Sequence, residues 1–382
     1  MKICDVVLNS IWFDPRVIKQ LSEYSKNGFD LYAVGLQDIK VNEQEISRLP
    51  GTVNIVPIER KYYRENRTIF TKIAREITIF RRVKSAIVQT RADVIHANDL
   101  NALVPSYYAA KALKCKLVFD THEVFLENHN IAHSRFKHAF WSYFEKKIIR
   151  KIDLLVCVSN AAASYFKKKY GVKDVIVVTN CARESDPNTF LSKESEYFEV
   201  LNHGQYYAGR GYDTMLDAAK LEKNKSIRFV LRGFGEMEDE LRSFVKGNEL
   251  QNVVFDPPVK VYELIPYAAR SHVGVAITEP TCLNFELSVS NKLFEYAAAG
   301  LPVIMSNIPE HRFLNDKYKF GIVMKENTGE CLLEAVEKLY SDTDFYNMCA
   351  QNAVIMSQEL TWHNEFNKLI DKEINMTKEC SS

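Results

Sequence analysis

The sequence predicts an α/β protein built on two doubly wound parallel sheets, and two observations carry this prediction. Short apolar runs, typical of buried strands, alternate with helix-patterned segments up to residue 178, and the alternation begins again at residue 199. Between the two series, residues 183–197 are polar and without periodicity, which indicates a linker. We therefore expect an N-terminal domain over residues 1–182 and a C-terminal domain over residues 183–361.

The elements of the N-terminal series follow one another closely. The expected strands are Ile3–Leu8, Leu31–Val34, Asn54–Pro57, Val94–His96, Leu117–Phe119, Leu154–Val158 and Val175–Val178. The expected helices are Pro15–Asn27, Leu103–Leu113 and Ala161–Tyr170. Strands separated by helices pair in parallel, because a crossover helix returns the chain to the same edge.

The C-terminal series repeats this arrangement. Its expected strands are Glu199–Asn202, Ile227–Gly233, Val253–Phe255, Val273–Ile277 and Pro302–Met305. Its expected helices are Thr214–Leu221, Glu236–Val245 and a final one at about Trp362–Lys372.

The composition excludes several classes of protein. No apolar run approaches the roughly 18 residues that span a bilayer, and the chain enters its first strand without a signal peptide. Its eight cysteines form no Cys-x-x-Cys pair, so we expect neither a zinc site nor a disulfide framework. Reduced thiols favour a cytoplasmic location.

The charge is distributed unevenly. Residues 1–190 contain 30 lysines and arginines against 20 acidic residues, whereas residues 191–382 contain 20 against 29. This asymmetry indicates that the N-terminal half faces an anionic partner. No nucleic-acid motif is present, so we expect an anionic phospholipid surface rather than nucleic acid.

The most informative segment runs from Ser290 to Ile304 and reads as a cap, a short helix, a glycine stop and a buried strand. Ser290 is expected to cap the helix through its hydroxyl, and Gly300 with Pro302 to end it. The helix start at Asn291 and Lys292 is then a candidate anion site, since its N–H groups and its dipole favour negative charge.

This segment resembles the donor-binding helix of the retaining GT-B glycosyltransferases of family 4. The resemblance implies a GT-B fold of two Rossmann-like domains with an interdomain cleft, in which the helix of residues 362–382 crosses back onto the first domain. It also implies that Ser290, Asn291, Lys292 and Leu293 bind a nucleotide sugar and that Glu295 binds the ribose hydroxyls.

Two further segments resemble donor-site motifs of this family. Asn202-His203-Gly204-Gln205 with Gly209-Arg210-Gly211 resembles its phosphate clamp, although Gln205 stands at the first basic position and Arg210 replaces a lysine. The resemblance implies that Gly204 and Arg210 bind the donor and that Arg210 and Lys292, as catalytic residues, neutralise the leaving diphosphate. An arginine can grip a diphosphate through two parallel hydrogen bonds.

The turn beneath the nucleotide is expected at Gly233 and Gly235, and the base is expected to bind the backbone at Val259. This Gly-x-Gly is no dinucleotide fingerprint, because Glu238 stands where the third glycine would be. Asn9-Ser10-Ile11, not glycines, follows the first strand, so a nicotinamide dehydrogenase is disfavoured.

Three motifs in the N-terminal half continue the resemblance. Asp120-Thr121-His122-Glu123 follows a strand and resembles the family loop whose histidine lines the sugar pocket, so His122 is the expected catalytic histidine and Glu123 lies on the acceptor side. The segment from Asp93 to Asp99 resembles another family motif with Asn98 in place of a histidine, and it places Asp99 at the acceptor. His96 is read equally as structural or functional.

Phe13-Asp14-Pro15-Arg16-Val17 resembles the loop after the first strand in one branch of these enzymes. Asp14 and Arg16 are therefore acceptor-side candidates. A surface salt bridge between them is the equal alternative to an Arg16 that reaches an acceptor phosphate.

Two features depart from the family pattern or add to it. The first glutamate of the two-glutamate motif falls on Leu287, with Glu286 beside it, and no Asp-x-Asp-like cluster is present, so no metal or other cofactor is expected. Residues 60–84 and Arg135–Arg150 mix basic and aromatic side chains. The first is interpreted either as an interfacial helix on anionic lipid or as an amphipathic helix with a solvated basic side, and the second favours the lipid-facing interpretation.

These observations predict a retaining glycosyltransferase that moves a hexose from a UDP- or GDP-sugar to a glycan or lipid-linked glycan. The setting implied by the resemblance is assembly of surface polysaccharide, such as lipopolysaccharide O-antigen or capsule, with the enzyme cytoplasmic and peripheral on the inner face of the membrane. Two alternatives stay open: a catalytically silent GT-B scaffold and a nucleotide-sugar 2-epimerase of the same fold.

Overall fold

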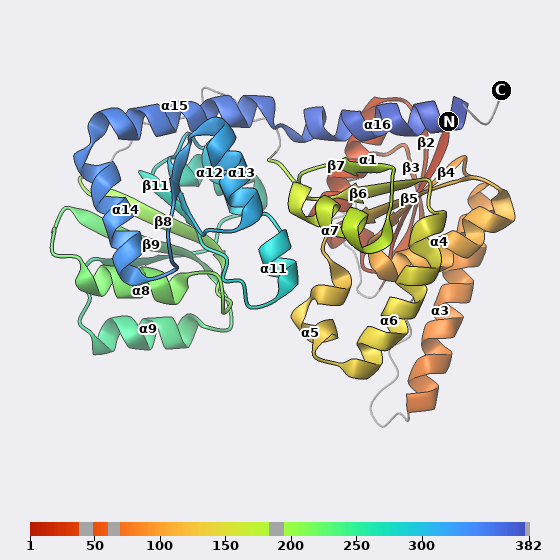
Figure 1. Cartoon of the computed structure of the whole chain (residues 1–382), viewed down its shortest axis with the longest axis horizontal. Helices are drawn as coiled ribbons and strands as arrows, with labels where there is room; N and C mark the ends of the chain where they lie inside the picture. The colour runs from red at the N-terminus through yellow and green to blue at the C-terminus, as the bar shows by residue number, and fades with distance from the viewer. Residues whose placement is uncertain (38–48, 60–68, 183–194, 379–382) are drawn as a thin grey trace. The chain divides into compact units, whose positions relative to one another are not determined.

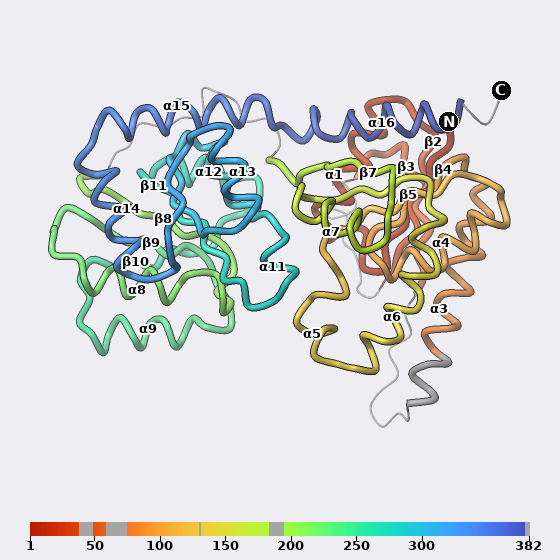
Figure 2. The backbone as a smooth tube through the Cα atoms, viewed as in Figure 1, coloured from red at the N-terminus to blue at the C-terminus, as the bar shows by residue number. Residues whose placement is uncertain are grey.

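A computed structural model describes residues 1–37, 49–59, 69–182 and 195–378 (Figures 1 and 2). The chain divides into two compact units, one made of Met1–Asn180 with Glu365–Ser382 and the other of Cys181–Asn364. Each unit contains one sheet, and every strand pair is parallel. Most of the expected linker lies outside the described residues.

The sheet of the N-terminal unit has the strand order β3-β2-β1-β4-β5-β6-β7. Its strands are β1 (Lys2–Val7), β2 (Asp30–Gln37), β3 (Val53–Glu59), β4 (Val94–Asn98), β5 (Lys116–Thr121), β6 (Leu154–Cys157) and β7 (Val175–Val177). Its α-helices are α1 (Pro15–Lys26), α3 (Ile69–Thr90), α4 (Asp99–Leu113), α5 (His129–Ala132), α6 (Arg135–Ile148), α7 (Asn160–Tyr170) and α16 (Trp362–Lys378), with short 3₁₀ helices η1 (Ile11–Phe13), η2 (Phe125–Glu127) and η3 (Ile149–Lys151).

The sheet of the C-terminal unit has the order β10-β9-β8-β11-β12-β13. Its strands are β8 (Phe198–Gln205), β9 (Ile227–Phe234), β10 (Val253–Asp256), β11 (Val273–Ala276), β12 (Val303–Met305) and β13 (Gly321–Val323). Its helices are α8 (Tyr212–Leu221), α9 (Glu238–Gly247), η5 (Val261–Glu263), α10 (Leu264–Ala268), α11 (Leu283–Leu287), α12 (Asn291–Ala298), α13 (Pro309–Tyr318), α14 (Gly329–Ser341) and α15 (Thr343–Glu359).

Both sheets are doubly wound, as the sequence predicts. In each sheet the strand order reverses beside the first strand, between β1 and β4 and between β8 and β11. Ligands of such sheets bind beyond the carboxyl ends of the strands at this reversal. The strands that flank it are largely buried, which explains their continuous apolar runs.

Helix α16 completes the N-terminal unit by lying along α1 (Figure 2). The ring of Tyr24 in α1 packs edge-on against Phe366, at 4.9 Å between centroids. Its hydroxyl donates to the buried Glu373 at 2.8 Å. The C-terminal helix therefore contributes both apolar and polar contacts to the core of the first unit.

Several elements differ from the sequence expectation. Helix α4 begins at Asp99, four residues before the expected start, and strand β13 with helices α13 to α15 was not predicted. Gly300 has φ +69 after α12, as its predicted role as a helix stop requires. Ser290 occupies the N-cap position of α12, but its side chain makes no capping hydrogen bond, so the expectation of a hydroxyl cap is wrong.

Candidate functional site

The donor-site candidates of the C-terminal unit converge where β8 ends and α12 begins. Gly204 lies near the end of β8, Arg210 in the loop that follows and Lys292 in the first turn of α12. A Cβ added to Gly204 would lie 3.5 Å from Cε of Lys292, so the lysine side chain passes directly over the strand end.

Arg210 and Lys292 form a pair of like charges. Burial, together with the neighbouring Arg210 charge, lowers the pKa of Lys292 to about 7. Burial also lowers the pKa of Arg210, whose guanidinium stacks over the ring of Phe285 at 4.7 Å. Two half-buried cations that repel each other would both stabilise a bound anion. This is the electrostatic property of a phosphate site.

Gly211 shapes the loop that carries Arg210. Its φ is +76, and a Cβ there would lie 2.4 Å from Cβ of Ile277, which follows β11. Only glycine fits both requirements, so the loop is pressed onto the strand ends at the reversal of the sheet. Arg210 is thereby fixed at the place where a doubly wound sheet binds its ligand.

Glu295 is hydrogen-bonded to a histidine. Nε2 of His203 donates to Oε2 of Glu295 at 2.7 Å, and Nδ1 of His203 is buried without a hydrogen-bond partner. The Glu295 side chain is 26% exposed, so its carboxylate is held by His203 and still reaches solvent.

The remaining donor-site candidates differ in burial and in the elements that carry them. The Leu293 side chain is fully buried in the core, whereas Asn291 is exposed. A Cβ on Gly233 would lie 1.8 Å from the carbonyl oxygen of Gly204, and one on Gly235 would lie 2.5 Å from the amide nitrogen of Tyr206. Both glycines therefore permit β9 to end against β8. Val259 lies in the loop after β10.

In the N-terminal unit, His122 lies at the end of β5 within a polar cluster. Its Nε2 donates to Oδ1 of Asn98 at 3.0 Å, and its backbone N–H donates to Asp99 at 3.1 Å. Burial disfavours the charged ring, but the carboxylates of Asp99 and Asp120 raise the pKa of His122. Burial raises the pKa of Asp99 to about 6. Asn98, which replaces the family histidine, therefore helps to orient the His122 ring through Nε2.

Arg16 does not play either role that the sequence suggested. It is 4% exposed, and its guanidinium donates to both carboxylate oxygens of Asp120 and to the carbonyl of Val178. Neither an acceptor phosphate nor a surface salt bridge with Asp14 fits this position. Asp14 instead caps α1 by accepting from the N–H groups of Arg16 and Val17.

His96 is part of a buried ionic network. Its ring lies 3.3 Å from Asp120 and 3.4 Å from Glu373 of α16. Although burial alone would lower it, hydrogen bonds to these carboxylates raise the pKa of His96 to about 10. The structural reading of His96 therefore holds. Glu123, the last acceptor-side candidate, accepts from Asn128 at 2.9 Å.

Sequence reasoning missed several of these residues. Four of them lie within the motifs described above but had no assigned role: Asn98, Asp120, Asn202 and His203. Glu373 lies outside every motif. Polar residues within apolar strands were the available signal, since a buried polar side chain needs a partner. The partner of Glu373 could not be read from the chain because it lies 277 residues away.

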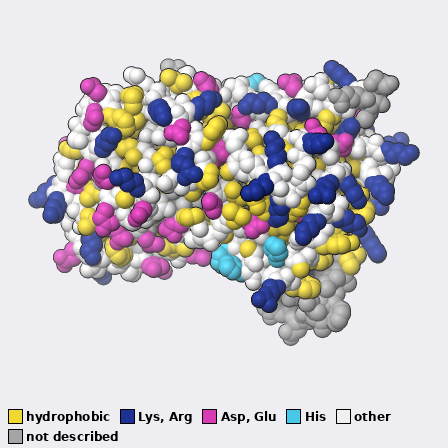
Figure 3. All heavy atoms as spheres, in the orientation of Figure 1, with side chains coloured by type: hydrophobic (Ala, Val, Ile, Leu, Met, Phe, Trp, Pro, Cys, Tyr) yellow, Lys and Arg dark blue, Asp and Glu magenta, His cyan; other side chains and the backbone are white. Residues whose placement is uncertain are grey.

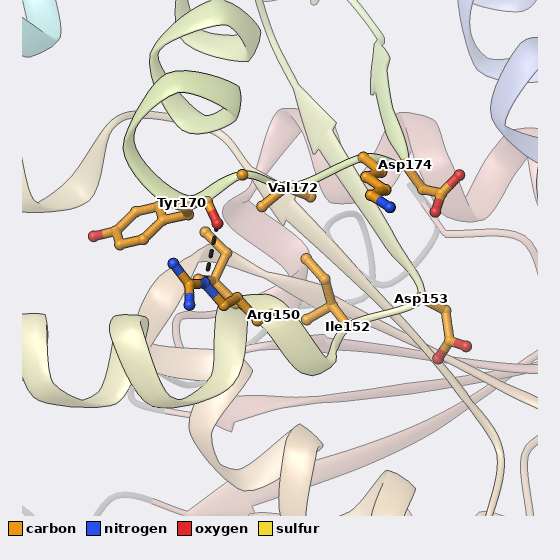
Figure 4. A pocket seen from close by; sticks show the side chains of 9 residues that line it. Arg150, Ile152, Asp153, Tyr170, Val172 and Asp174 are labelled. Carbon is orange, nitrogen blue, oxygen red and sulfur yellow. Dashed lines mark hydrogen bonds between the residues drawn. The ribbon is translucent and has the colours of Figure 1, made fainter.

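A pocket of about 500 Å³ lies elsewhere in the N-terminal unit (Figure 4). The residues that line it lie just before the first residues of β6 and β7. One of them, Arg150, donates a hydrogen bond to the carbonyl of Tyr170 at 3.1 Å. This is the amino-terminal edge of the sheet, opposite to the edge that carries His122. None of the predicted site residues lines it.

Two general findings complete the description of the site. Among the described residues, no group of three or more His, Cys, Asp or Glu side chains is placed to hold a metal ion. Metal independence stays a prediction. Within the same ranges, no helix combines the length and apolar composition that a membrane span requires.

Known proteins resemble this chain in both units. The family described as Glycosyltransferase Family 4 matches residues 16–183, and the family described as Glycosyl transferases group 1 matches residues 198–342. No curated protein matches the sequence.

Several solved structures share the fold at low sequence identity. Sucrose-phosphate synthase from Thermosynechococcus elongatus has a TM-score of 0.77 at 14% identity, with full coverage of both chains. HepE of Anabaena, in complex with UDP and glucose, has a TM-score of 0.74 at 15% identity, covering 97% of this chain and 99% of that one. The lipopolysaccharide outer core galactosyltransferase WaaB has a TM-score of 0.67 at 10% identity, with full coverage of both.

Proposed function

Because the chain belongs to the group 1 glycosyltransferases of family 4, which act on nucleotide sugars, we propose that it transfers a hexose from a UDP- or GDP-sugar with retention of configuration. The observation that carries this proposal is the pair Arg210 and Lys292. Each cation is half-buried, and burial together with the Arg210 charge lowers the pKa of Lys292 to about 7. A bound diphosphate would relieve this repulsion.

The pair supplies the charge stabilisation that the reaction needs. In the transfer, the bond to the diphosphate breaks ahead of attack, so negative charge grows on the leaving group, where preorganised cations lower the barrier most. Arg210 offers a fork of donors, and Lys292 a single ammonium. Glu295, held by His203, is proposed to bind the ribose, and His122 the sugar.

The acceptor is proposed to be a glycan or a lipid-linked glycan of a surface polysaccharide, in lipopolysaccharide or capsule assembly. The galactosyltransferase named above acts on lipopolysaccharide by its title, which supports this choice. Sucrose-phosphate synthase shares the fold, so the fold alone does not select the acceptor.

An anionic membrane is the proposed surface partner, and α6 is the element that supports it. Phe136, Phe140 and Tyr143 on this helix are 65%, 44% and 59% exposed. The basic residues Arg135 and Lys147 flank them, Lys137 lies between Phe136 and Phe140, and the one acidic residue of the helix is buried. Figure 3 shows dark-blue basic side chains gathered over the N-terminal unit and more magenta acidic ones over the C-terminal unit. Part of the expected 60–84 stretch lies outside the described residues.

Nucleotide release tests the enzymatic proposal. Purified protein is incubated with a panel of UDP- and GDP-sugars and candidate acceptors, and free nucleoside diphosphate is measured. Acceptor-stimulated release that falls at least 100-fold in Lys292→Met, but not in the exposed control Lys338→Met, is expected. Binding without turnover on every donor and acceptor would favour the silent scaffold. Conversion of the donor to its 2-epimer would favour the epimerase.

Flotation with vesicles tests the membrane proposal. The triple change Phe136→Ser, Phe140→Ser and Tyr143→Ser is expected to reduce binding to vesicles that contain phosphatidylglycerol. The matched control is Val261→Ser with Tyr262→Ser, which removes exposed apolar side chains from the other unit. Equal flotation of all three proteins contradicts the proposal.

A further inference from the structure

Asn202 joins the two cationic segments of the donor site. It is fully buried near the end of β8. Its Oδ1 accepts from Nζ of Lys292 at 2.6 Å, and its Nδ2 donates to the backbone carbonyl of Arg210 at 3.2 Å. One amide therefore contacts the helix that carries one cation and the loop that carries the other.

The surroundings of Lys292 show why such a contact matters. The lysine side chain has a flexible four-carbon stem, and the positive charge of Arg210 repels its ammonium group. The Tyr212 ring lies 5.3 Å from Nζ, and the Tyr212 hydroxyl is buried without a hydrogen-bond partner. Glu295, the nearby carboxylate, hydrogen-bonds His203. Asn202 is thus the group that orients the ammonium by a hydrogen bond.

An amide suits this position better than a carboxylate. A carboxylate at 2.6 Å would neutralise the ammonium and compete with an incoming anion, whereas an amide oxygen orients the group and leaves its charge available. At the same time the amide N–H fixes the backbone from which the Arg210 side chain extends.

We propose that Asn202 is a positioning residue that holds Lys292 and Arg210 in the arrangement that binds the diphosphate of the donor. This inference rests on the proposed function. It assigns to Asn202 a coupling between two binding residues and no contact with the reacting atoms.

The test compares Asn202→Ala and Asn202→Asp with the control Asn252→Ala. Asn252 also donates to a backbone carbonyl of the same unit, that of Ala219 at 2.8 Å, but contacts neither cation. UDP and GDP binding is measured by calorimetry. The titration of Lys292 in the empty protein is followed by NMR of ¹³Cε-labelled lysine, with the signal assigned through Lys292→Arg.

We expect Asn202→Ala to weaken nucleotide binding about 10-fold at pH 7, and its effect to shrink at least 3-fold when Lys292→Met is already present. Asn202→Asp should raise the titration midpoint of Lys292 by at least one pH unit, because a carboxylate stabilises the ammonium. Asn252→Ala should change neither quantity.

Unchanged binding in Asn202→Ala, or fully additive effects of Asn202→Ala and Lys292→Met, would overturn the inference. An unmoved lysine titration in Asn202→Asp would do the same, and that measurement requires no nucleotide. If the wild-type protein binds neither UDP nor GDP, the proposed donor fails, and the titration still decides the contact between Asn202 and Lys292.

Discussion

Oε1 of Glu373 lies 3.4 Å from Nδ1 of His96, and both side chains are fully buried. The pair joins the C-terminal helix α16 to the central strand β4 of the first sheet. Its second partner, Tyr24, donates to the same carboxylate.

Glu373→Gln is expected to lower the free energy of unfolding by about 3 kcal/mol, because it removes one of the two carboxylates that stabilise the buried His96 ring, and a buried charge that loses a partner is costly. Denaturant unfolding of the whole chain measures this. Glu359→Gln is the control, since Glu359 is half-exposed where it bonds Tyr318, and it should cost less than about 1 kcal/mol. Equal costs would show that the buried pair contributes little.

The same network predicts a pH dependence of stability. The pKa of His96 is raised to about 10 in the folded chain, above its ordinary value of 6.5. The stabilisation is therefore complete below pH 6.5 and is lost as the pH rises from there toward 10. Thermal unfolding at constant ionic strength should show this decline, and it should be shallower in Glu373→Gln. A decline of the same slope in both proteins would locate its origin elsewhere.

The lowered pKa of Lys292 predicts that the protein takes up a proton when it binds a nucleotide. Its pKa is lowered to about 7 in the empty site, and a bound diphosphate would raise it again. At pH 8 binding should therefore take up nearly one proton, which calorimetry detects as a binding enthalpy that depends on the ionisation enthalpy of the buffer. Lys292→Arg keeps the charge but does not titrate in this range, so its enthalpy should be independent of the buffer.

Arg210→Lys tests whether the guanidinium group binds the diphosphate through two parallel hydrogen bonds. The positive charge is retained, but the two parallel hydrogen bonds and the stacking on Phe285 are lost. We expect UDP or GDP affinity to fall about 10-fold, equal to about 1.4 kcal/mol. Arg242→Lys, at an exposed pair with Glu238, should leave affinity unchanged. A fall in both variants would point to a general loss of stability.

Gly211→Ala should destabilise the C-terminal unit by about 2–4 kcal/mol, since its methyl group would overlap Ile277 and its φ is positive. Adding Ile277→Ala should recover the part due to overlap. Gly247→Ala is the matched control, because Gly247 lies in α9 with open space where a Cβ would go. It should be neutral or stabilising. Urea unfolding of the four proteins compares them.

Most of the fold could be predicted from the sequence, because fully buried parallel strands have continuous apolar sequences. Gly300 and Pro302 likewise marked the end of α12 from local chemistry alone. The site was predicted less completely. Arg16 binds Asp120, 104 residues away, and no local pattern distinguishes such an arginine from one that faces a ligand. Asn202 was equally hidden, since its importance lies in a contact with Lys292, 90 residues away.

The return of α16 to the first unit has a consequence for synthesis on the ribosome. Tyr24 gains its carboxylate partner, and His96 the second of its two, only after residue 373 is translated, although the seven strands of their sheet are complete by Val177. At typical elongation rates this delay is on the order of ten seconds. During that interval the buried ionic network of the first sheet lacks one of its carboxylates, so the network is completed only in the last stage of synthesis.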